Sequence, residues 1–264
     1  MFPKIIHQIW FDFNNGVSID ADRQELIQMN KHLAKKNDYA YEFWSLSRAN
    51  EFIEKNYPFY ISFMKKKWKN EIIKCDFFRY LIMYHYGGLY VDLDFGLTQS
   101  FAEMNGEEND KYDIVLFEEW YESANMKNTD SSEGSLHNGF LLSQPKQDFW
   151  LKMMNNIVSN SFLITTKSDV WKLSGTNLLR NFYIAYNDGT IIHRPYFLAC
   201  PFKSVSRTDP TKQVLCTNES SVPMSLQESS WKFFTLKEFK TRPVFESCHA
   251  ACIGVDGGSL WTNI

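Results

Sequence analysis

Hydrophobic residues along this chain follow two patterns. Short runs rich in β-branched and aromatic residues predict strands, whereas apolar residues three and four positions apart predict helices. The predicted strands are 4–10, 39–44, 89–93, 112–117, 136–143 and 244–253. The predicted helices are 18–36, one opened by Pro58, 71–86, 149–158 and 170–186. Because strands and helices alternate in the first half, we expect an α/β architecture with a mostly parallel sheet.

The segment 71–86 is apolar nearly all round, which predicts a buried central helix. Gly87 and Gly88 end it, a short strand follows, and then come two carboxylates, Asp92 and Asp94. Acidic side chains at the carboxyl end of a strand lie where open α/β sheets hold ligands. In an extended segment the two would point to one side and could face a divalent cation that holds phosphate. This suggests transfer of a group from a diphosphate-linked donor; two acids in a turn are the simpler alternative.

Composition narrows the classes of function. The 264 residues suffice for one large α/β domain, and the net charge of -3 argues against a protein that binds nucleic acid or a membrane surface. No apolar run approaches the roughly 18 residues that span a bilayer, and the N-terminus lacks the features of a signal peptide. We therefore expect a cytoplasmic protein without a membrane span. With 22 Phe, 13 Tyr and 8 Trp, aromatic faces are also available for stacking on bases and sugars.

The five cysteines are an odd number, so free thiols are the expectation in such a protein. Cys248, His249 and Cys252 superficially resemble a metal site. A second pair of ligands at zinc spacing is missing, which disfavours zinc.

Four further features could carry chemistry. Asp76 and Arg79 are three apart and hence share one face of the apolar helix; they form either a structural ion pair or a pair that reaches into the site. Trp10, at the end of the first strand, either packs in the core or stacks on a nucleobase. Asn138 either hydrogen-bonds sugar hydroxyls or belongs to a turn. Ser174 and Gly175 make either a tight helix contact or a backbone approach to ligand.

The C-terminal run from Asp256 through Ser259 to Trp261 combines a carboxylate, a hydroxyl and an indole. A disordered end is the plain interpretation. The alternative is a tail that folds over a diphosphate, supplies a metal ligand and an N–H donor, and excludes water.

Several motifs together resemble one family. They are PKIIHQIW at residues 3–10, D-x-x-R-Y at 76–80, YGGLYVDLD at 86–94 and a late Ser-x-Trp. This set resembles the DXD-containing sugar transferases, which include yeast mannosyltransferases and share their fold with the glucosylating clostridial toxins. The resemblance is strongest over residues 3–96 and weaker at 136–143 and 248–261. It implies a GT-A-type, Rossmann-like fold with a mixed, mostly parallel sheet, in a single domain, 1–264, whose residues 254–264 form an active-site tail.

The resemblance also implies a nucleotide-sugar donor, Mn²⁺ or Mg²⁺, and retention of the anomeric configuration. By position, Trp10 would stack on the nucleobase. Asp76, Arg79 and Asn138 would hold the donor sugar. Asp92 would contact ribose and sugar and reach the metal directly or through water, and Asp94 would bind the metal directly.

In the tail, the resemblance makes Asp256 and Ser259 metal ligands and Trp261 the donor to the glycosidic oxygen. The tail reads Ser-Leu-Trp, whereas the mannosyltransferase branch has Ser adjacent to Trp. A UDP-linked hexose or N-acetylhexosamine is therefore favoured and GDP-mannose stays open. The acceptor is an unidentified glycan or protein hydroxyl. The chain also lacks the membrane anchor common in Golgi members, which suggests a bacterial or viral enzyme.

No carboxylate is placed as an obvious covalent nucleophile. We therefore expect a same-face substitution in which the leaving phosphate accepts the acceptor's proton. Two rivals are a metal-dependent phosphohydrolase, which would not need Trp10 and Trp261, and a sugar-binding protein with a decayed site.

Overall fold

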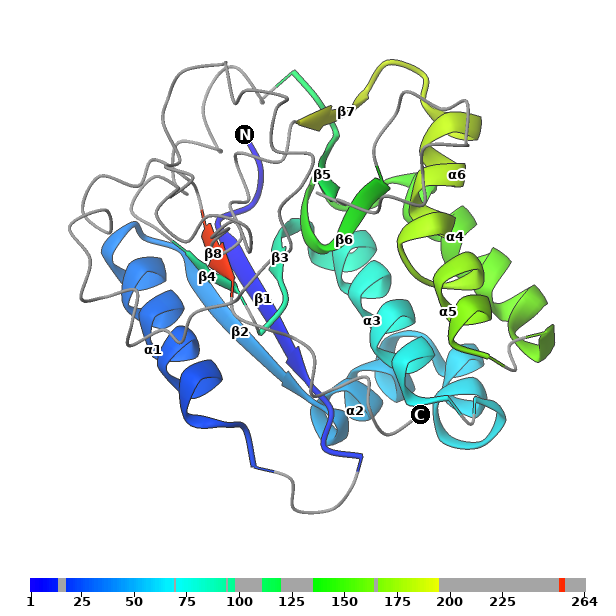
Figure 1. Ribbon diagram of the computed structural model, residues 1–264, viewed down its shortest axis with the longest axis horizontal. Helices are drawn as coiled ribbons and strands as arrows, with labels where there is room; N and C mark the ends of the chain where they lie inside the picture. Colours follow the sequence, from blue (N-terminus) through cyan, green and yellow to red (C-terminus); the bar gives the residue numbers. More distant parts are fainter. Residues whose placement is uncertain are drawn as a thin grey trace, which may run out of the picture.

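The computed structural model describes residues 1–13, 18–68, 70–93, 95–97, 111–119, 135–163, 166–194 and 252–254. Helical segments separate the first three strands, and among the described residues three more strands then follow without a helix between them (Figure 1). The strands are β1 (Ile5–Trp10), β2 (Ala40–Ser45), β3 (Gly88–Val91), β4 (Phe95–Leu97), β5 (Ile114–Glu119), β6 (Ser135–Ser143), β7 (Ile191–Arg194) and β8 (Cys252–Gly254). The α-helices are α1 (Ala21–Lys36), α2 (Leu46–Asn56), α3 (Glu71–Tyr86), α4 (Asp148–Asn160), α5 (Lys167–Leu173) and α6 (Thr176–Tyr186).

Six of these strands form one sheet in the order β2-β1-β3-β6-β5-β7. Strand β1 runs parallel to β2 and β3, β6 runs antiparallel to β3 and β5, and β5 runs parallel to β7. Strands β4 and β8 pair separately and antiparallel. The expected mixed, mostly parallel sheet with flanking helices is confirmed.

The sheet divides the core in two. Helix α1 covers one face, where Ile6, Leu33 and Val91 belong to the same buried cluster. Helices α3, α4 and α6 cover the other face, where Ile9, Phe77 and other side chains build the larger cluster (Figure 1). Because alternate side chains of a strand point to opposite faces, β1 contributes to both clusters.

Helix α3 has the bounds that its apolar pattern predicts. Asn70 caps it by accepting a hydrogen bond from the N–H of Ile72, and Gly87 ends it with φ 63°. A Cβ at Gly87 would lie 2.5 Å from the carbonyl oxygen of Ser143, so both the dihedral and the close approach require glycine here. Ser45 is the N-cap of α2, and its hydroxyl accepts a hydrogen bond from the N–H of Arg48.

Two predicted helices are wrong in detail. The segment opened by Pro58 is a 3₁₀ turn, η1 (Pro58–Tyr60), followed by a π-helical turn, η2 (Phe63–Lys67). The predicted helix 170–186 is broken into α5 and α6 at Ser174 and Gly175. The break persists because the hydroxyl of buried Tyr80 donates to the carbonyl of Ser174 at 2.8 Å, which the helix ladder would otherwise use.

No helix in the described ranges is both long enough and apolar enough to cross a membrane. Cys75 is a free thiol, as expected. Cys200, Cys216, Cys248 and His249 lie outside the described residues.

Candidate active site

The backbone of Asp92 is fixed at the carboxyl end of β3. Its N–H donates to the carbonyl of Gly139 on β6 at 2.8 Å, and its own carbonyl accepts from the N–H of Phe95 at 3.1 Å. That second bond closes a turn directly after β3, so the extended geometry that we expected from Asp92 onwards is wrong. Asp94 lies outside the described residues.

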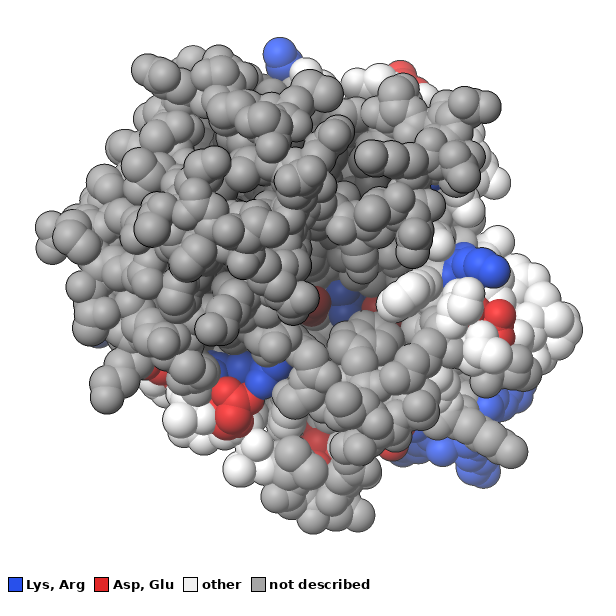
Figure 2. All heavy atoms as spheres, viewed as in Figure 1, with Lys and Arg blue, Asp and Glu red and all other residues white. Residues whose placement is uncertain are grey.

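The carboxylate of Asp92 has two differently placed oxygens. Its Oδ1 accepts a hydrogen bond from the Tyr90 hydroxyl at 2.5 Å and lies 3.5 Å from Nη2 of Arg79. Its Oδ2 has no hydrogen-bond partner among the described residues. The side chain as a whole is 30% exposed. Figure 2 shows acidic and basic atoms next to one another near the middle of the face that it draws.

Arg79 links the two carboxylates. Its Nη2 lies 3.3 Å from Oδ1 of Asp76, one helical turn earlier on α3. Its Nη1 donates to the carbonyl of Asn138 at 2.8 Å, and its guanidinium lies 5.0 Å from the centre of the Tyr90 ring. The prediction that Asp76 and Arg79 share a helix face is confirmed. The Nε of Arg79 is buried and has no hydrogen-bond acceptor among the described residues. Buried donors normally have a partner, so this one calls for an explanation.

Asp76 is surrounded by donors. The Ser174 hydroxyl donates to its Oδ2 at 2.7 Å, and the Asn138 amide donates to its Oδ1 at 3.2 Å. Burial raises the pKa of Asp76 to about 6, and Arg79 and the hydrogen bond from Ser174 oppose that rise. Burial alone would lower the pKa of Arg79, but Asp92, Tyr90 and Asp76 hold it well above its usual value. The cluster thus keeps one permanent cation between two carboxylates.

Gly139 leaves room for this arrangement. A Cβ there would lie 2.4 Å from Oδ2 of Asp92 and 2.6 Å from Cε1 of His137. The Gly139 N–H donates to Nδ1 of His137 at 2.8 Å, and burial lowers the pKa of His137 to about 4. The imidazole is therefore neutral at physiological pH and lies beside the Asp92 carboxylate.

Trp10 ends β1, whose carboxyl end lies next to that of β3, but its side chain points to the opposite face of the sheet from Asp92. By strand alternation it shares a face with Ile6 and Gln8, towards α1, whereas Asp92 contacts Arg79 of α3. Its side chain is half-buried. The structure therefore brings together Asp76, Arg79, Asp92 and Asn138. Trp10 is not part of this cluster, because its side chain is on the opposite face of the sheet.

The remaining expected site residues lie outside the described part of the chain: Asp94, Asp256, Ser259 and Trp261. Within the described part, no three His, Cys, Asp or Glu side chains form a group that could hold a metal. The sequence reasoning missed Tyr90 and left the role of Ser174 open. A signal existed for both, since a polar group inside an apolar segment needs a partner.

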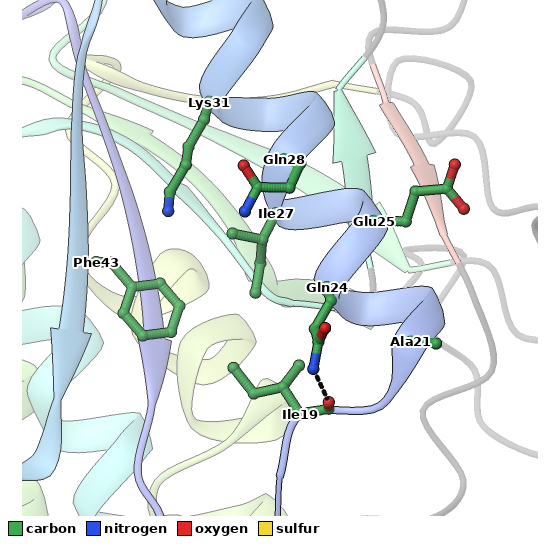
Figure 3. A pocket seen from close by; sticks show the side chains of 8 residues that line it. All are labelled: Ile19, Ala21, Gln24, Glu25, Ile27, Gln28, Lys31 and Phe43. Atoms are coloured by element: carbon green, nitrogen blue, oxygen red, sulfur yellow. Dashed lines mark hydrogen bonds between the residues drawn. The ribbon is translucent and has the colours of Figure 1, made fainter.

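A separate groove of about 610 Å³ lies between α1 and β2 (Figure 3). Ile27 and Phe43 form part of its apolar wall, and Nε2 of Gln24 donates to the carbonyl of Ile19 at 2.6 Å. None of the expected site residues lines it.

Comparison with known proteins gives three findings besides a family match. Residues 22–112 match a family described as the glycosyltransferase sugar-binding region containing the DXD motif. An inositol phosphoceramide mannosyltransferase of Schizosaccharomyces pombe is 32% identical over 99 residues, which cover 38% of this chain and 27% of that protein. The chain thus spans about a quarter of the length of this fungal relative.

A glycosyltransferase of Acanthamoeba polyphaga mimivirus, itself uncharacterised, is 27% identical over 209 residues, covering 76% of this chain and 74% of that protein. Among solved structures, the PaToxG glycosyltransferase is similar with a TM-score of 0.47 and 18% identity, covering 71% of each chain. The family resemblance expected from the motifs is confirmed.

Proposed function

We propose that this chain, whose residues 22–112 match the glycosyltransferase sugar-binding region containing the DXD motif, transfers a hexose or N-acetylhexosamine from a nucleotide sugar to a hydroxyl of a glycan or protein. One observation carries the proposal. Arg79 lies between Asp76 and Asp92 at the carboxyl end of β3, inside the matched region, with Asn138 completing the cluster. Such a cluster offers both donors and acceptors to sugar hydroxyls.

The carboxylate of Asp92 suits a divalent cation, Mn²⁺ or Mg²⁺. The Oδ2 of Asp92 is a hard oxygen ligand without a hydrogen-bond partner among the described residues, on a side chain that is 30% exposed. In the proposal, Asp92 and Asp94 hold the cation together with Asp256 and Ser259 of the tail 254–264, in one domain. Such an ion supplies charge stabilisation to a departing diphosphate.

Different residues of the chain would bind different parts of the nucleotide-sugar donor. Trp10 stacks on the base on the α1 side of the sheet edge, and Arg79, Asp76 and Asn138 bind the sugar on the α3 side. An extended nucleoside diphosphate sugar could reach from one side of the edge to the other. Trp261 donates its indole N–H to the glycosidic oxygen, a preorganised donor worth roughly 3 kcal/mol to the transition state.

For a reaction that retains the anomeric configuration, the state of Asp76 favours same-face substitution over a covalent intermediate on this carboxylate. Its side chain is 4% exposed and both carboxylate oxygens accept hydrogen bonds, so it is poorly placed to attack an anomeric carbon. The proton of the acceptor hydroxyl then goes to the leaving phosphate oxygen as the new glycosidic bond forms.

The favoured donor is a UDP-sugar, because the tail reads Ser-Leu-Trp rather than having Ser adjacent to Trp as in the mannosyltransferase branch. GDP-mannose is the second candidate, because the fungal relative is named a mannosyltransferase.

The test is a thermal-shift panel of UDP-glucose, UDP-galactose, UDP-N-acetylglucosamine and GDP-mannose, each with and without Mn²⁺. A ligand at 100 times its Kd stabilises the fold by about 2.7 kcal/mol. We expect a Mn²⁺-dependent rise in Tm with one donor, followed by slow donor hydrolysis whose first sugar product has the donor's anomeric configuration by NMR. Release of inorganic phosphate would instead indicate the phosphohydrolase. The absence of any shift would contradict donor binding.

A further inference from the structure

Both ends of strand β3 are hydrogen-bonded to neighbouring side chains of β1. Nε2 of His7 donates to the carbonyl of Gly87, just before the strand, at 3.1 Å. Nε2 of Gln8 donates to the carbonyl of Asp92, just after the strand, at 3.2 Å. Both side chains are fully buried. Because consecutive residues of a strand face opposite ways, the two contacts lie on opposite faces of the sheet.

Gln8 also connects Asp92 to the edge strand β2. The Tyr41 hydroxyl donates to Oε1 of Gln8 at 2.5 Å. A carbonyl oxygen can only accept, so the amide must turn Nε2 towards Asp92 and Oε1 towards Tyr41. Burial raises the pKa of Tyr41 far above its usual value, which keeps the hydroxyl protonated as a donor. A continuous hydrogen-bonded path thus runs from β2 through β1 to the backbone of Asp92.

The carbonyl of Asp92 accepts two hydrogen bonds, one from Phe95 and one from Gln8. The bond from Phe95 is local and closes the turn after β3. The bond from Gln8 ties this turn to β1, and the N–H of Asp92 separately ties it to β6 through the carbonyl of Gly139. Without Gln8, the carbonyl of Asp92 would keep only its hydrogen bond from Phe95, and the Tyr41 hydroxyl would lose its acceptor. Leaving buried polar groups without hydrogen-bond partners is costly.

We propose that Gln8 is a positioning residue for the carboxylate of Asp92, because it hydrogen-bonds the backbone turn from which that carboxylate would reach the cation. The proposal rests on the function proposed above. Groups that orient the ligands of a metal typically change its affinity by ten- to a hundredfold when removed.

The matched variants are Gln8→Leu and His7→Leu in the full chain. Each replaces a fully buried polar side chain of β1 that contacts a backbone carbonyl beside β3, but only Gln8 contacts Asp92. The probe is Mn²⁺ alone, titrated by the electron paramagnetic resonance signal of the free ion. We expect the Mn²⁺ Kd of Gln8→Leu to rise by roughly tenfold. His7→Leu should keep the wild-type Kd although its Tm falls.

A second measurement is independent of metal. Hydrogen exchange of the Phe95 amide reports on the turn, and we expect faster exchange in Gln8→Leu than in His7→Leu. A Gln8→Leu protein with wild-type Mn²⁺ affinity and wild-type exchange at Phe95, but a lower Tm, would overturn the proposal and leave Gln8 as a core residue. A wild-type protein that binds no Mn²⁺ contradicts the proposed function instead, and the exchange measurement still decides the role of Gln8.

If Gln8→Leu does not fold, Tyr41→Phe serves as the milder variant. Tyr41 is half-buried on an edge strand, and its removal frees the Gln8 amide to turn without taking it away. We expect both the Mn²⁺ Kd and the exchange rate at Phe95 to change in the same direction by smaller factors. Wild-type values of both in that variant would then overturn the proposal.

Discussion

The guanidinium of Arg79 lies 3.5 Å from the carboxylate of Asp92, although the first comes from the middle of α3 and the second from the end of β3. The same nitrogen lies 3.3 Å from Asp76. An ion pair therefore links α3 to the carboxyl end of β3, where the sugar donor is proposed to bind. Loss of the Arg79 guanidinium would leave the carboxylates of Asp76 and Asp92 without the positive charge that lies between them.

Arg79→Gln should consequently lose both stability and turnover. Breaking a buried pair by removing one partner costs about 3 kcal/mol, and loss of one positioned donor lowers turnover by about a hundredfold. Urea unfolding and donor hydrolysis measure the two effects. Arg48→Gln is the control, since Arg48 pairs with Glu42 at the surface, where such pairs contribute about 1 kcal/mol or less. Full turnover in Arg79→Gln would remove Arg79 from the site.

Gly139→Ala should displace the Asp92 carboxylate. The added methyl group would lie 2.4 Å from Oδ2, so the side chain must move, at a cost of about 1–3 kcal/mol. We expect a higher KM for the donor and weaker Mn²⁺ binding, measured by initial rates and by metal titration. Gly189→Ala strains the backbone at φ 93° but has open space around it, so it should lower the Tm without changing the KM. Equal KM values in the two variants would contradict this prediction.

Turnover should fall as the pH drops through about 6. The donors around Asp76 require its carboxylate form, and burial has raised its pKa to about 6. The stability contribution has the opposite sign. Since the folded-state pKa exceeds the unfolded value of 3.8, this group stabilises the fold most below about pH 4, and that stabilisation is lost as the pH rises through about 6. Rates and unfolding free energies between pH 4 and 7 measure both; Asp76→Asn should lack this slope in stability.

Ser174→Ala should move the acid limb of the rate profile to higher pH. The hydroxyl donates to the Asp76 carboxylate at 2.7 Å, and loss of a donor to the charged form raises the pKa of an acid. Ser143→Ala is a matched control, because Ser143 is equally buried but bonds Trp150 instead. An unchanged limb in Ser174→Ala would show that this hydrogen bond does not govern the titration.

Asp94→Ala should abolish the Mn²⁺-dependent part of the thermal shift and of turnover while leaving the Tm without metal close to that of the wild type. The reason is that the proposal gives Asp94 a direct bond to the cation. Donor hydrolysis with and without chelator is the measurement. Metal-dependent activity in this variant would refute the assignment of Asp94.

Local patterns predicted the elements best. Helix α3 has its predicted bounds because its apolar residues, its Asn70 cap and the glycine pair after it all agree. The side-by-side placement of Asp76 and Arg79 follows from helical spacing alone.

What the pattern could not supply is contact between distant segments. The turn at Asp92 depends on Gln8 and Gly139, and the break after α5 depends on Tyr80, which lies 94 residues earlier. The wrong extended geometry at Asp92 and the wrong continuous helix 170–186 both arose from judging each segment without these partners.

The place of β6 in the sheet constrains how the protein can be made. Strand β6 lies between β3 and β5, both of which precede it in the chain, and it delivers Asn138 and Gly139 to the cluster. During synthesis, residues 22–112 therefore leave the ribosome before the segments that finish the cluster do. Strand β5 has no neighbour in the sheet until β6 or β7 arrives. Long-range pairing of this kind slows folding, so assembly of the cluster is a late event in the life of each newly made chain.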